Sequence, residues 1–268
     1  MQDPARPPAP SLARALGALA ERFLRALGGI SILSGQTIRR SFHRGFSVRA
    51  LVYQIESIGL LSVPIAVLTA VFSSMVMTVQ FAVQMSRFGV KEYVSSVVSL
   101  SLVRELGPAL TALLVGGRVG AGIAAELGSM RVTEQVDAIR AMGADPVRKL
   151  VVPRVLATTL VLPLLTILAD ILGVLGAMVI ARVDSDVGMR LFMESTLRSV
   201  TLEDFLHGLI KTVFFGFLLG VIACYKGLNT TNGTEGVGRA TTETVVITSL
   251  TTLCADFVLT NLLLGFGI

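Results

Sequence analysis

One uncharged stretch constrains this chain more than any other feature: no Asp, Glu, Lys or Arg occurs between Ser57 and Ser86. A helix rises about 1.5 Å per residue, and the hydrocarbon core of a bilayer is about 30 Å thick. The stretch is therefore long enough to cross a membrane with residues to spare. We expect the excess to be taken up by tilt or by a break near Pro64.

Composition extends this conclusion to the whole chain. Hydrophobic residues make up 53% of the sequence and charged residues only 15%, which indicates a polytopic membrane protein rather than a soluble domain. Further spans are expected at about 93–126, 151–181, 205–225 and from residue 241 to the C-terminus, with polar loops around 184–198 and 226–239. The predicted fold is all-α, with about five transmembrane helices in a single domain over residues 51–268.

The first fifty residues differ from the rest because basic side chains crowd into them. Residues 1–10 carry four prolines and are expected to form a disordered tail. In residues 11–27, apolar side chains recur at helical spacing, which is typical of an amphipathic helix lying in the membrane interface. A helix packed on protein is the alternative. We interpret residues 11–50 as a basic interfacial region that faces an anionic membrane surface, not nucleic acid.

Orientation follows from where Lys and Arg gather near the ends of the spans. The N-terminal region is strongly basic, and so is the segment after the second span, which contains Arg131, Arg140, Arg148, Lys149 and Arg154. Both are expected to be cytoplasmic, and five spans then place the C-terminus on the outer side.

Arg104 and Glu105 are predicted to lie well inside the second span. An ionised group there costs about 2.5 to 3.5 kcal/mol even on a lenient insertion scale, so both should face protein or a water-filled cavity. Adjacent helical residues diverge by about 100°, so the two side chains cannot point along one line. A lipid-facing or lumen-facing position for one of them is one interpretation, and pairing of either with Asp170 or Asp256 is the other.

The second half of the first span, Phe72 to Met85, mixes Met, Ser and Gln among apolar residues. Methionine side chains adapt to varied apolar shapes, which suits a cavity for flexible chains, and helix packing explains the same residues equally well. In the second span, Gly116, Gly117 and Gly120 form a small-residue surface that favours close helix packing. No GxxxxGK[ST] phosphate loop occurs in the chain, so any ATP must be bound by another polypeptide.

A short amphipathic helix is predicted between the second and third spans. Thr133 is a plausible N-cap, Glu134 suits the first turn, and Gly143 with Asp145-Pro146 is a stop signal. Its expected apolar stripe consists of Val132, Val136, Ile139 and Met142, and its polar surface of Glu134, Gln135, Asp137 and Arg140. A helix of this kind suits docking into the groove of a partner. A connector lying on the membrane surface is the alternative.

No arrangement of catalytic residues is apparent. His43 and His207 occur without HExxH or a Cys/His cluster, so no metal site is predicted, and Cys224 and Cys254 are expected to be packing residues. We therefore expect a chain that is not an enzyme and holds no cofactor of its own.

Several motifs together resemble the MlaE (YrbE-like) permease family of bacterial lipid transporters. They are Arg104-Glu-Leu-Gly-Pro108, the run from Gly117 to Gly128, Thr133-Glu-Gln-Val-Asp-Ala138, Met142-Gly-Ala-Asp-Pro146, Pro153-Arg154, Gly238-Arg-Ala-Thr-Thr242 and Asp256-Phe-Val-Leu-Thr260. The resemblance covers roughly residues 50–264, and the proline-rich start departs from it.

The resemblance implies the membrane subunit of an ABC transporter that moves phospholipids between the inner and outer membranes of bacteria. It implies a second copy of the chain, two cytoplasmic ATPase subunits that bind ATP, and a periplasmic MCE-domain protein. It places ATPase coupling on residues 133–143, carried by Thr133, Glu134, Gln135, Asp137, Arg140 and Met142. It places the lipid against Met77, Met85, Phe88 and Glu105, with Arg104 alongside.

We therefore expect a multi-pass inner-membrane lipid permease that maintains outer-membrane lipid asymmetry, with a cytoplasmic N-terminus and a periplasmic C-terminus. The alternative is a secondary transporter that uses the intramembrane carboxylates Asp170, Asp256 and Glu105 as ion or proton carriers.

Overall fold

A computed structural model describes residues 12–41, 47–184 and 187–265. The predicted disordered tail at residues 1–10 lies outside this range. The elements are α1 (Leu12–Ser41), α2 (Val48–Leu60), α3 (Val63–Arg87), η1 (Lys91–Tyr93), α4 (Val94–Ser101), η2 (Leu102–Leu106), α5 (Gly107–Val132), α6 (Gln135–Ala141), η3 (Val147–Val151), α7 (Val152–Asp184), α8 (Met189–Ser199), α9 (Leu202–Leu228) and α10 (Gly233–Gly265). The all-α prediction is confirmed: every regular element in the described ranges is helical.

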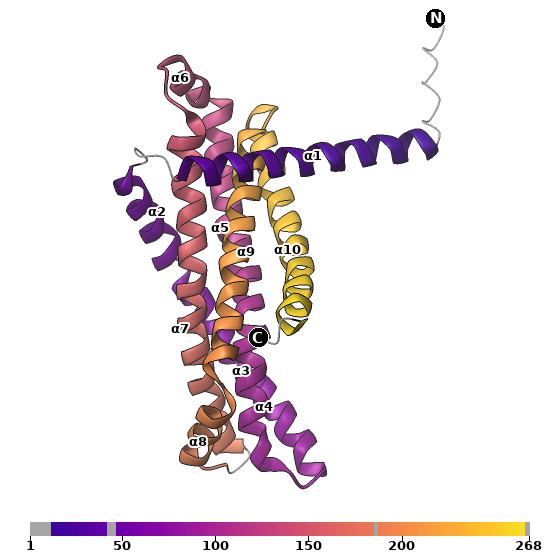
Figure 1. The fold of residues 1–268 in the computed structure, drawn as a ribbon, viewed down its shortest axis with the longest axis vertical. Helices are drawn as coiled ribbons and strands as arrows, with labels where there is room; N and C mark the ends of the chain where they lie inside the picture. Colours follow the sequence, from indigo (N-terminus) through magenta and orange to yellow (C-terminus); the bar gives the residue numbers. More distant parts are fainter. Residues whose placement is uncertain (1–11, 42–46, 185–186, 266–268) are drawn as a thin grey trace, which may run out of the picture.

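Five segments of the described chain are long and apolar enough to cross a membrane, as predicted. They are Val48–Arg87, Lys91–Val132, Val147–Asp184, Leu202–Leu228 and Gly233–Gly265. Figure 1 shows α5, α7 and α9 running side by side along the long axis of the molecule. Helix α3 packs on α7, and α10 packs on α5 and α9.

The break expected near Pro64 is present and divides the first span into α2 and α3. Proline has no N–H to donate and its ring clashes with the carbonyl four residues earlier, so the α2 helix cannot continue through this position. The Ser62 hydroxyl donates instead to the carbonyl of Ile58, 2.6 Å away. Arg118 of α5 also donates to the Ser62 hydroxyl at 2.9 Å, which ties the break to the second span.

Two wide π-helical turns, η2 and η3, interrupt the second and third spans. Gly107 N–H bonds to the carbonyl of Leu102, and Val152 N–H bonds to that of Val147, both one residue further back than in an α-helix. Each turn is followed two residues later by a proline, Pro108 or Pro153. A wider turn relieves the clash of each proline with the carbonyl four residues earlier.

Two predicted loops are wrong. The segment around 184–198 contains the helix α8, which buries Phe192 and Thr196 against the bundle. Packing of this apolar face stabilises a helix that could not be predicted from the polar composition of the segment. Helix α10 begins at Gly233, earlier than residue 241, because Asn232 and Gly233 adopt left-handed conformations (φ 65° and 62°) that reverse the chain within a few residues.

The core lies among α5, α7 and α9, where small residues allow close approach. A Cβ at Gly216 of α9 would meet the backbone of Thr158 and Thr159, and one at Gly220 would meet Val155. Helix α10 buries only Ala240, Thr244, Thr248 and Thr252 among its described residues. The outer helices α3 and α10 therefore present long unburied apolar faces.

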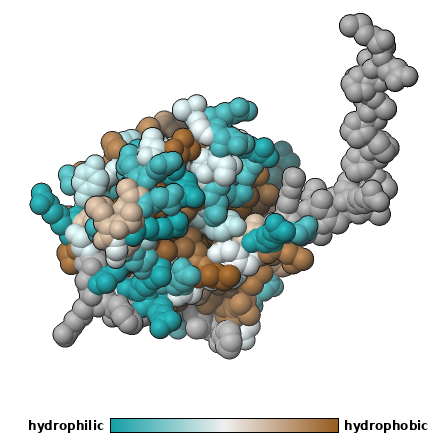
Figure 2. All heavy atoms as spheres, turned by 90° about the horizontal axis from the view of Figure 1, so that it is seen from above, coloured by the Kyte–Doolittle hydropathy of each residue, from teal (hydrophilic) through white to brown (hydrophobic). Residues whose placement is uncertain are grey.

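Helix α1 lies across the end of the bundle where α6 is found (Figure 1). It extends past the predicted end at residue 27 as far as Ser41. Leu33 and Thr37 are buried, whereas Leu24, Ile32 and Ile38 are exposed, and Gly29 lies directly under the ring of Tyr225. Viewed end-on from this side, hydrophilic side chains cover much of the molecule (Figure 2).

Candidate functional site

The wide turn η2 carries Arg104 and Glu105, and their side chains diverge as helical geometry predicts. Arg104 pairs with Asp204 of α9, with Nη1 3.0 Å from Oδ1. Its second nitrogen, Nη2, lies 3.1 Å from Nδ1 of His207. Since a guanidinium has no acceptor, Nδ1 of His207 accepts this hydrogen bond and its proton lies on Nε2. Arg104 is thus committed to the first turns of α9.

Asp204 is itself fixed by a capping box at the start of α9. Its Oδ2 accepts from the backbone N–H of Thr201 at 2.9 Å and from the Thr201 hydroxyl at 2.7 Å. The Thr201 hydroxyl in turn accepts from the N–H of Asp204. Reciprocal capping of this kind holds the carboxylate in one orientation. Arg104 therefore joins η2 to a rigid helix start rather than to a mobile side chain.

Glu105 joins a second charged group, the Lys211 cluster, which consists of Glu105, Lys211, Asp256 and Thr260. Lys211 Nζ lies 2.6 Å from Glu105 Oε2 and 3.3 Å from Asp256 Oδ1. The Thr260 hydroxyl approaches Glu105 Oε1 at 3.4 Å. Lys211 is fully buried, whereas the Glu105 side chain is 40% exposed. Glu105 is thus the most exposed of the three charged members, since the Asp256 side chain is 20% exposed.

Lys211 also supplies a hydrogen bond that the backbone of the wide turn lacks. Pro108 has no N–H, so the carbonyl of Arg104, four residues earlier, loses its helical partner. Lys211 Nζ donates to this carbonyl at 3.3 Å. A buried unpaired carbonyl is costly, so one lysine stabilises both the wide turn and the carboxylates around it.

Neither ion pair is the one considered from the sequence, in which Arg104 or Glu105 would pair directly with Asp170 or Asp256. Glu105 meets Asp256 only through Lys211, and Arg104 pairs with Asp204. The roles of Asp204, His207 and Lys211 were missed. Lys211 could have been found, because it is an isolated charge within the apolar run 205–225, where an ionisable residue is by default a functional candidate.

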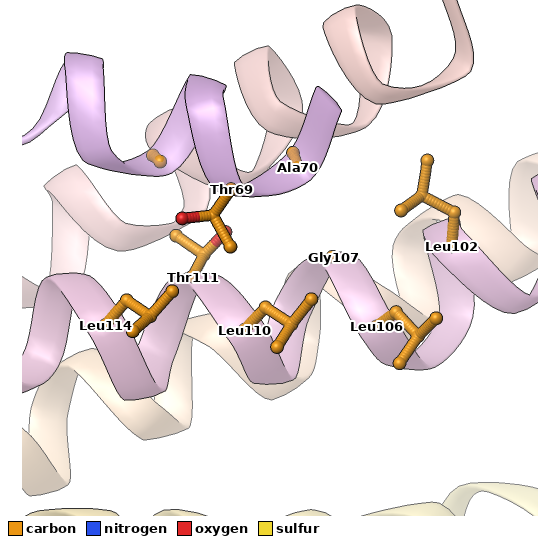
Figure 3. A pocket seen from close by; sticks show the side chains of 9 residues that line it. Thr69, Ala70, Leu102, Leu106, Gly107, Leu110, Thr111 and Leu114 are labelled. Carbon is orange, nitrogen blue, oxygen red and sulfur yellow. The ribbon is translucent and has the colours of Figure 1, made fainter. Parts of the chain in front are cut away.

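A narrow apolar crevice separates α3 from η2 and α5 (Figure 3). Thr69 and Thr111 point toward one another across it, and Leu106, Leu110 and Leu114 follow one face of the helix. The crevice leaves no room for a water molecule. It is therefore a tight helix contact in this conformation.

The predicted lipid contacts fall in two places. Met77 and Met85 are half-buried and pack against residues of α3, α4 and α7, while Phe88 is 78% exposed at the end of α3. Met77 also lines a shallow hollow of about 380 Å³ with Phe72, Val76 and Gln80. Glu105 faces α9 and α10 instead. A single chain therefore does not gather the methionines and the charged turn around one space in the parts that are described.

Helix α6 corresponds to the predicted helix at 133–143 but starts differently. Thr133 is the C-cap of α5, so its prediction as an N-cap is wrong; its hydroxyl bonds back to the carbonyl of Ser129 at 2.9 Å. Glu134 takes the N-cap position in a left-handed conformation (φ 59°), which turns the chain sharply between the helices. The stop at Gly143 is present, with a φ of 73°.

The surface of α6 is polar and exposed at the extreme end of the molecule (Figure 1). Val136 is fully buried, but Met142, predicted in the same stripe, is 73% exposed. Asp137 accepts from Arg131 at 2.5 Å and from Arg140 at 3.0 Å. The hydrogen bond from Arg131 is the main reason that the pKa of Asp137 lies below its usual value. Glu134, Gln135 and Arg140 are also exposed.

The glycines of α5 lie against the two neighbouring helices. A Cβ at Gly116 or Gly120 would contact Leu219 of α9, and one at Gly117 would contact Val245 of α10. Farther along, Glu126 of α5 pairs with Arg154 of α7 at 2.9 Å. In the described ranges no three His, Cys, Asp or Glu side chains lie close enough to hold a metal ion.

Known proteins resemble this chain over most of its length. The family model described as Permease MlaE matches residues 51–262. A probable ABC transporter permease protein of Rickettsia felis is 37% identical over 252 residues, which covers 94% of this chain and 97% of the relative. One from Synechocystis is 39% identical and covers 86% and 88% of the two chains. The chloroplastic protein trigalactosyldiacylglycerol 1 of Arabidopsis thaliana is 35% identical over 87% of this chain and 66% of its own length.

Proposed function

This chain belongs to the MlaE permease family and is the permease subunit of an ABC transporter, and from that premise we propose that it moves phospholipids between the inner and outer membranes of a bacterium. Its substrate class, partners and orientation in the membrane are part of the same proposal.

The Lys211 cluster is the main structural support for this proposal. Lys211 lies about 14 Å along α9 from the start of the helix, inside a membrane span, and the cluster leaves the Glu105 carboxylate partly accessible. Exposed apolar side chains such as Phe257 and Leu262 lie on α10 beside it. A polar group within an apolar surface suits an amphipathic ligand, and the Arabidopsis relative bears the name of a galactolipid.

The faces of α3 and α10 that this chain leaves unburied favour a second copy, which would bring the Met77 surface and the Lys211 cluster around one cavity. Helices α1 and α6 lie at the same end of the bundle, in agreement with a cytoplasmic location for both (Figure 1). The C-terminus would then be periplasmic, on the side where an MCE-domain protein would receive or deliver lipid.

Energy would enter through α6. The chain contains no phosphate loop, so two separate ATPase subunits would bind ATP, and the exposed polar surface of α6 would dock into them. Closure of the ATPase dimer would narrow the cavity between the two permease copies. Removing acyl chains from apolar surface costs about 0.8 kcal/mol per CH₂, which explains the need for ATP.

The complex of this chain with its ATPase, purified into nanodiscs, tests the proposal. We expect phospholipid to co-purify and the Glu105→Lys variant to lose most of it, because a second cation would then face Lys211. Glu194→Lys is a matched control, since Glu194 pairs only with the exposed Arg190 of its own helix in the described structure. Absence of lipid from the wild-type complex, or intact outer-membrane asymmetry in cells carrying Glu105→Lys, contradicts the proposal.

A further inference from the structure

A buried carboxyl group behind the wide turn has no role in the sites described so far. Asp170 lies near the middle of α7, a helix of 33 residues, and is only 4% exposed. Its Oδ1 atom is buried and has no hydrogen-bond partner within the described chain. Such a group in the interior of a membrane span is rare and expensive, so its retention requires an explanation.

Asp170 points at the junction between η2 and α5. A Cβ added to Gly107 would overlap Oδ1 of Asp170 and would also lie 2.9 Å from the carbonyl oxygen of Leu102. The carboxyl and this carbonyl oxygen therefore face the same side of Gly107. Almost one turn later in α7, a Cβ at Gly173 would meet the side chain of Leu102, so the two helices are in close contact here.

The nearby cations are already committed. Arg104 binds Asp204 and His207, and Lys211 binds Glu105 and Asp256. The residues nearest the carboxyl group at Gly107 and Gly173 are Leu102 and Ala70, which carry no charge, and the Ser74 hydroxyl close by donates to the carbonyl of Gly173. An ionised Asp170 would thus be a buried acceptor facing another acceptor, with nothing to compensate its charge, whereas a protonated carboxyl group has one hydrogen to donate.

We propose that Asp170 is a positioning residue that remains protonated and donates a hydrogen bond to the carbonyl of Leu102, which fixes the wide turn that orients Arg104 and Glu105. The turn is then held from two sides: Lys211 of α9 donates to the carbonyl of Arg104, and Asp170 of α7 donates to that of Leu102. Gly107 is required between them because any side chain there would displace the carboxyl group.

Two measurements on the nanodisc complex test this inference, which rests on the proposed function only for the second. The first is the infrared difference spectrum between wild type and Asp170→Asn in D₂O. It should contain the C=O stretching band of one protonated carboxylic acid, present in the wild type and absent in the variant. A carboxylate band in its place overturns the proposal whether or not the complex transports lipid.

The second measurement is ATP-dependent lipid transfer. Asp170→Asn keeps the shape and a neutral donor, so transfer should stay within about twofold of wild type, whereas Asp170→Val should reduce it by about tenfold because the Leu102 carbonyl loses its second partner. Thr166→Val is the control, since the Thr166 hydroxyl bonds only within α7, to Leu162.

Equal loss in the Asn and Val variants indicates a proton carrier and overturns the positioning role, as does full transfer by Asp170→Val. If Val fails to assemble, the Asn result and the infrared band still decide. Absence of transfer by wild type counts against the proposed function alone.

Discussion

The wide turns η2 and η3 are each five residues long and each is followed by a proline, yet their surroundings differ. The charges of η2 are paired within the bundle: Arg104 pairs with Asp204 of α9, and Glu105 pairs with Lys211 of α9, which also lies close to Asp256 of α10. Next to η3, Arg154 donates to the carbonyl of Leu150 and reaches Glu126, whose side chain is 53% exposed. Just before η3, Asp145 pairs with Arg40 of α1, and both side chains are about one-third exposed.

The same backbone geometry thus occurs in two different environments, one inside the bundle and one at its end. The turn η2 packs against α7 and α9 inside the bundle, where its charges pair with the largely buried side chains of Asp204 and Lys211. The turn η3 connects α6 to α7 at the end of the bundle, where α1 also lies (Figure 1). Under the proposed function, η2 would serve the lipid end of the permease and η3 the end that receives motion from the ATPase.

Loss of the buried cation should produce the largest effect. Lys211→Met leaves Glu105 and Asp256 facing each other without their shared cation. Breaking a fully buried ion pair costs about 3–5 kcal/mol, and the partial exposure of Glu105 places the expected loss near the lower end of that range. We expect the complex to unfold at a clearly lower temperature in scanning fluorimetry. Adding Glu105→Gln and Asp256→Asn should recover most of the loss. A triple variant no more stable than Lys211→Met would show that the cluster is not an electrostatic unit.

The prolines should separate the two turns by function. Pro108→Ala supplies an N–H for the carbonyl of Arg104, so η2 can tighten and rotate Arg104 and Glu105 by about 100°. We expect lipid transfer to fall by about tenfold while ATPase subunits still co-purify. Pro153→Ala should have the opposite profile, with weaker stimulation of ATPase activity and lipid still bound. The same defect in both variants would remove the distinction between the turns.

Charge reversal on α6 should have a smaller effect, confined to the end of the bundle that is proposed to bind the ATPase. Glu134→Lys with Asp137→Lys replaces two exposed acidic side chains of α6 with cations, which reverses the charge at these positions of the proposed docking surface and so disturbs its electrostatic match with a partner. We expect about tenfold weaker association with the ATPase in a pull-down assay. The thermal stability of the permease should fall only slightly, because the ion pairs of Asp137 with Arg131 and Arg140 lie at the exposed surface. Unaltered association and transport would contradict the assignment of α6 as the coupling helix.

Acidification should have the smallest effect. The pKa of Asp137 lies below 3.8 in the folded chain, so its contacts with Arg131 and Arg140 are fully present above the unfolded value and are lost only as the pH falls through the folded value. Association with the ATPase should therefore stay constant between about pH 6 and pH 8. A marked change in that range would require another titrating group at this interface.

Parts of this structure follow from local sequence, and parts do not. Long apolar runs and Pro64 are local signals, which is why the five spans and the break between α2 and α3 were predictable. Helix α8 was not, because it depends on Phe192 packing against distant helices. The cap at Thr133 failed because a left-handed Glu134 turns the chain one residue later.

The charged site was only partly predictable, because tertiary packing and not local sequence determines which partners its residues meet. Burial of Arg104 and Glu105 follows from their place in an apolar run, and their divergence follows from helical geometry. Their partners lie about one hundred residues away in sequence, on α9, so no spacing rule selects Asp204 or Lys211. The carboxyl of Asp170 behind Gly107 is likewise a property of tertiary packing alone.

Photocrosslinking of a phospholipid with a photoreactive head group tests the central contrast most directly. In nanodiscs containing the permease and its ATPase, adducts should form on peptides that contain η2 and the second half of α10, and trapping the ATP-bound state should diminish them. Peptides that contain η3 should remain unlabelled in both states. Labelling of both turns to the same extent, or of η3 alone, would contradict the assignment of η2 to the lipid.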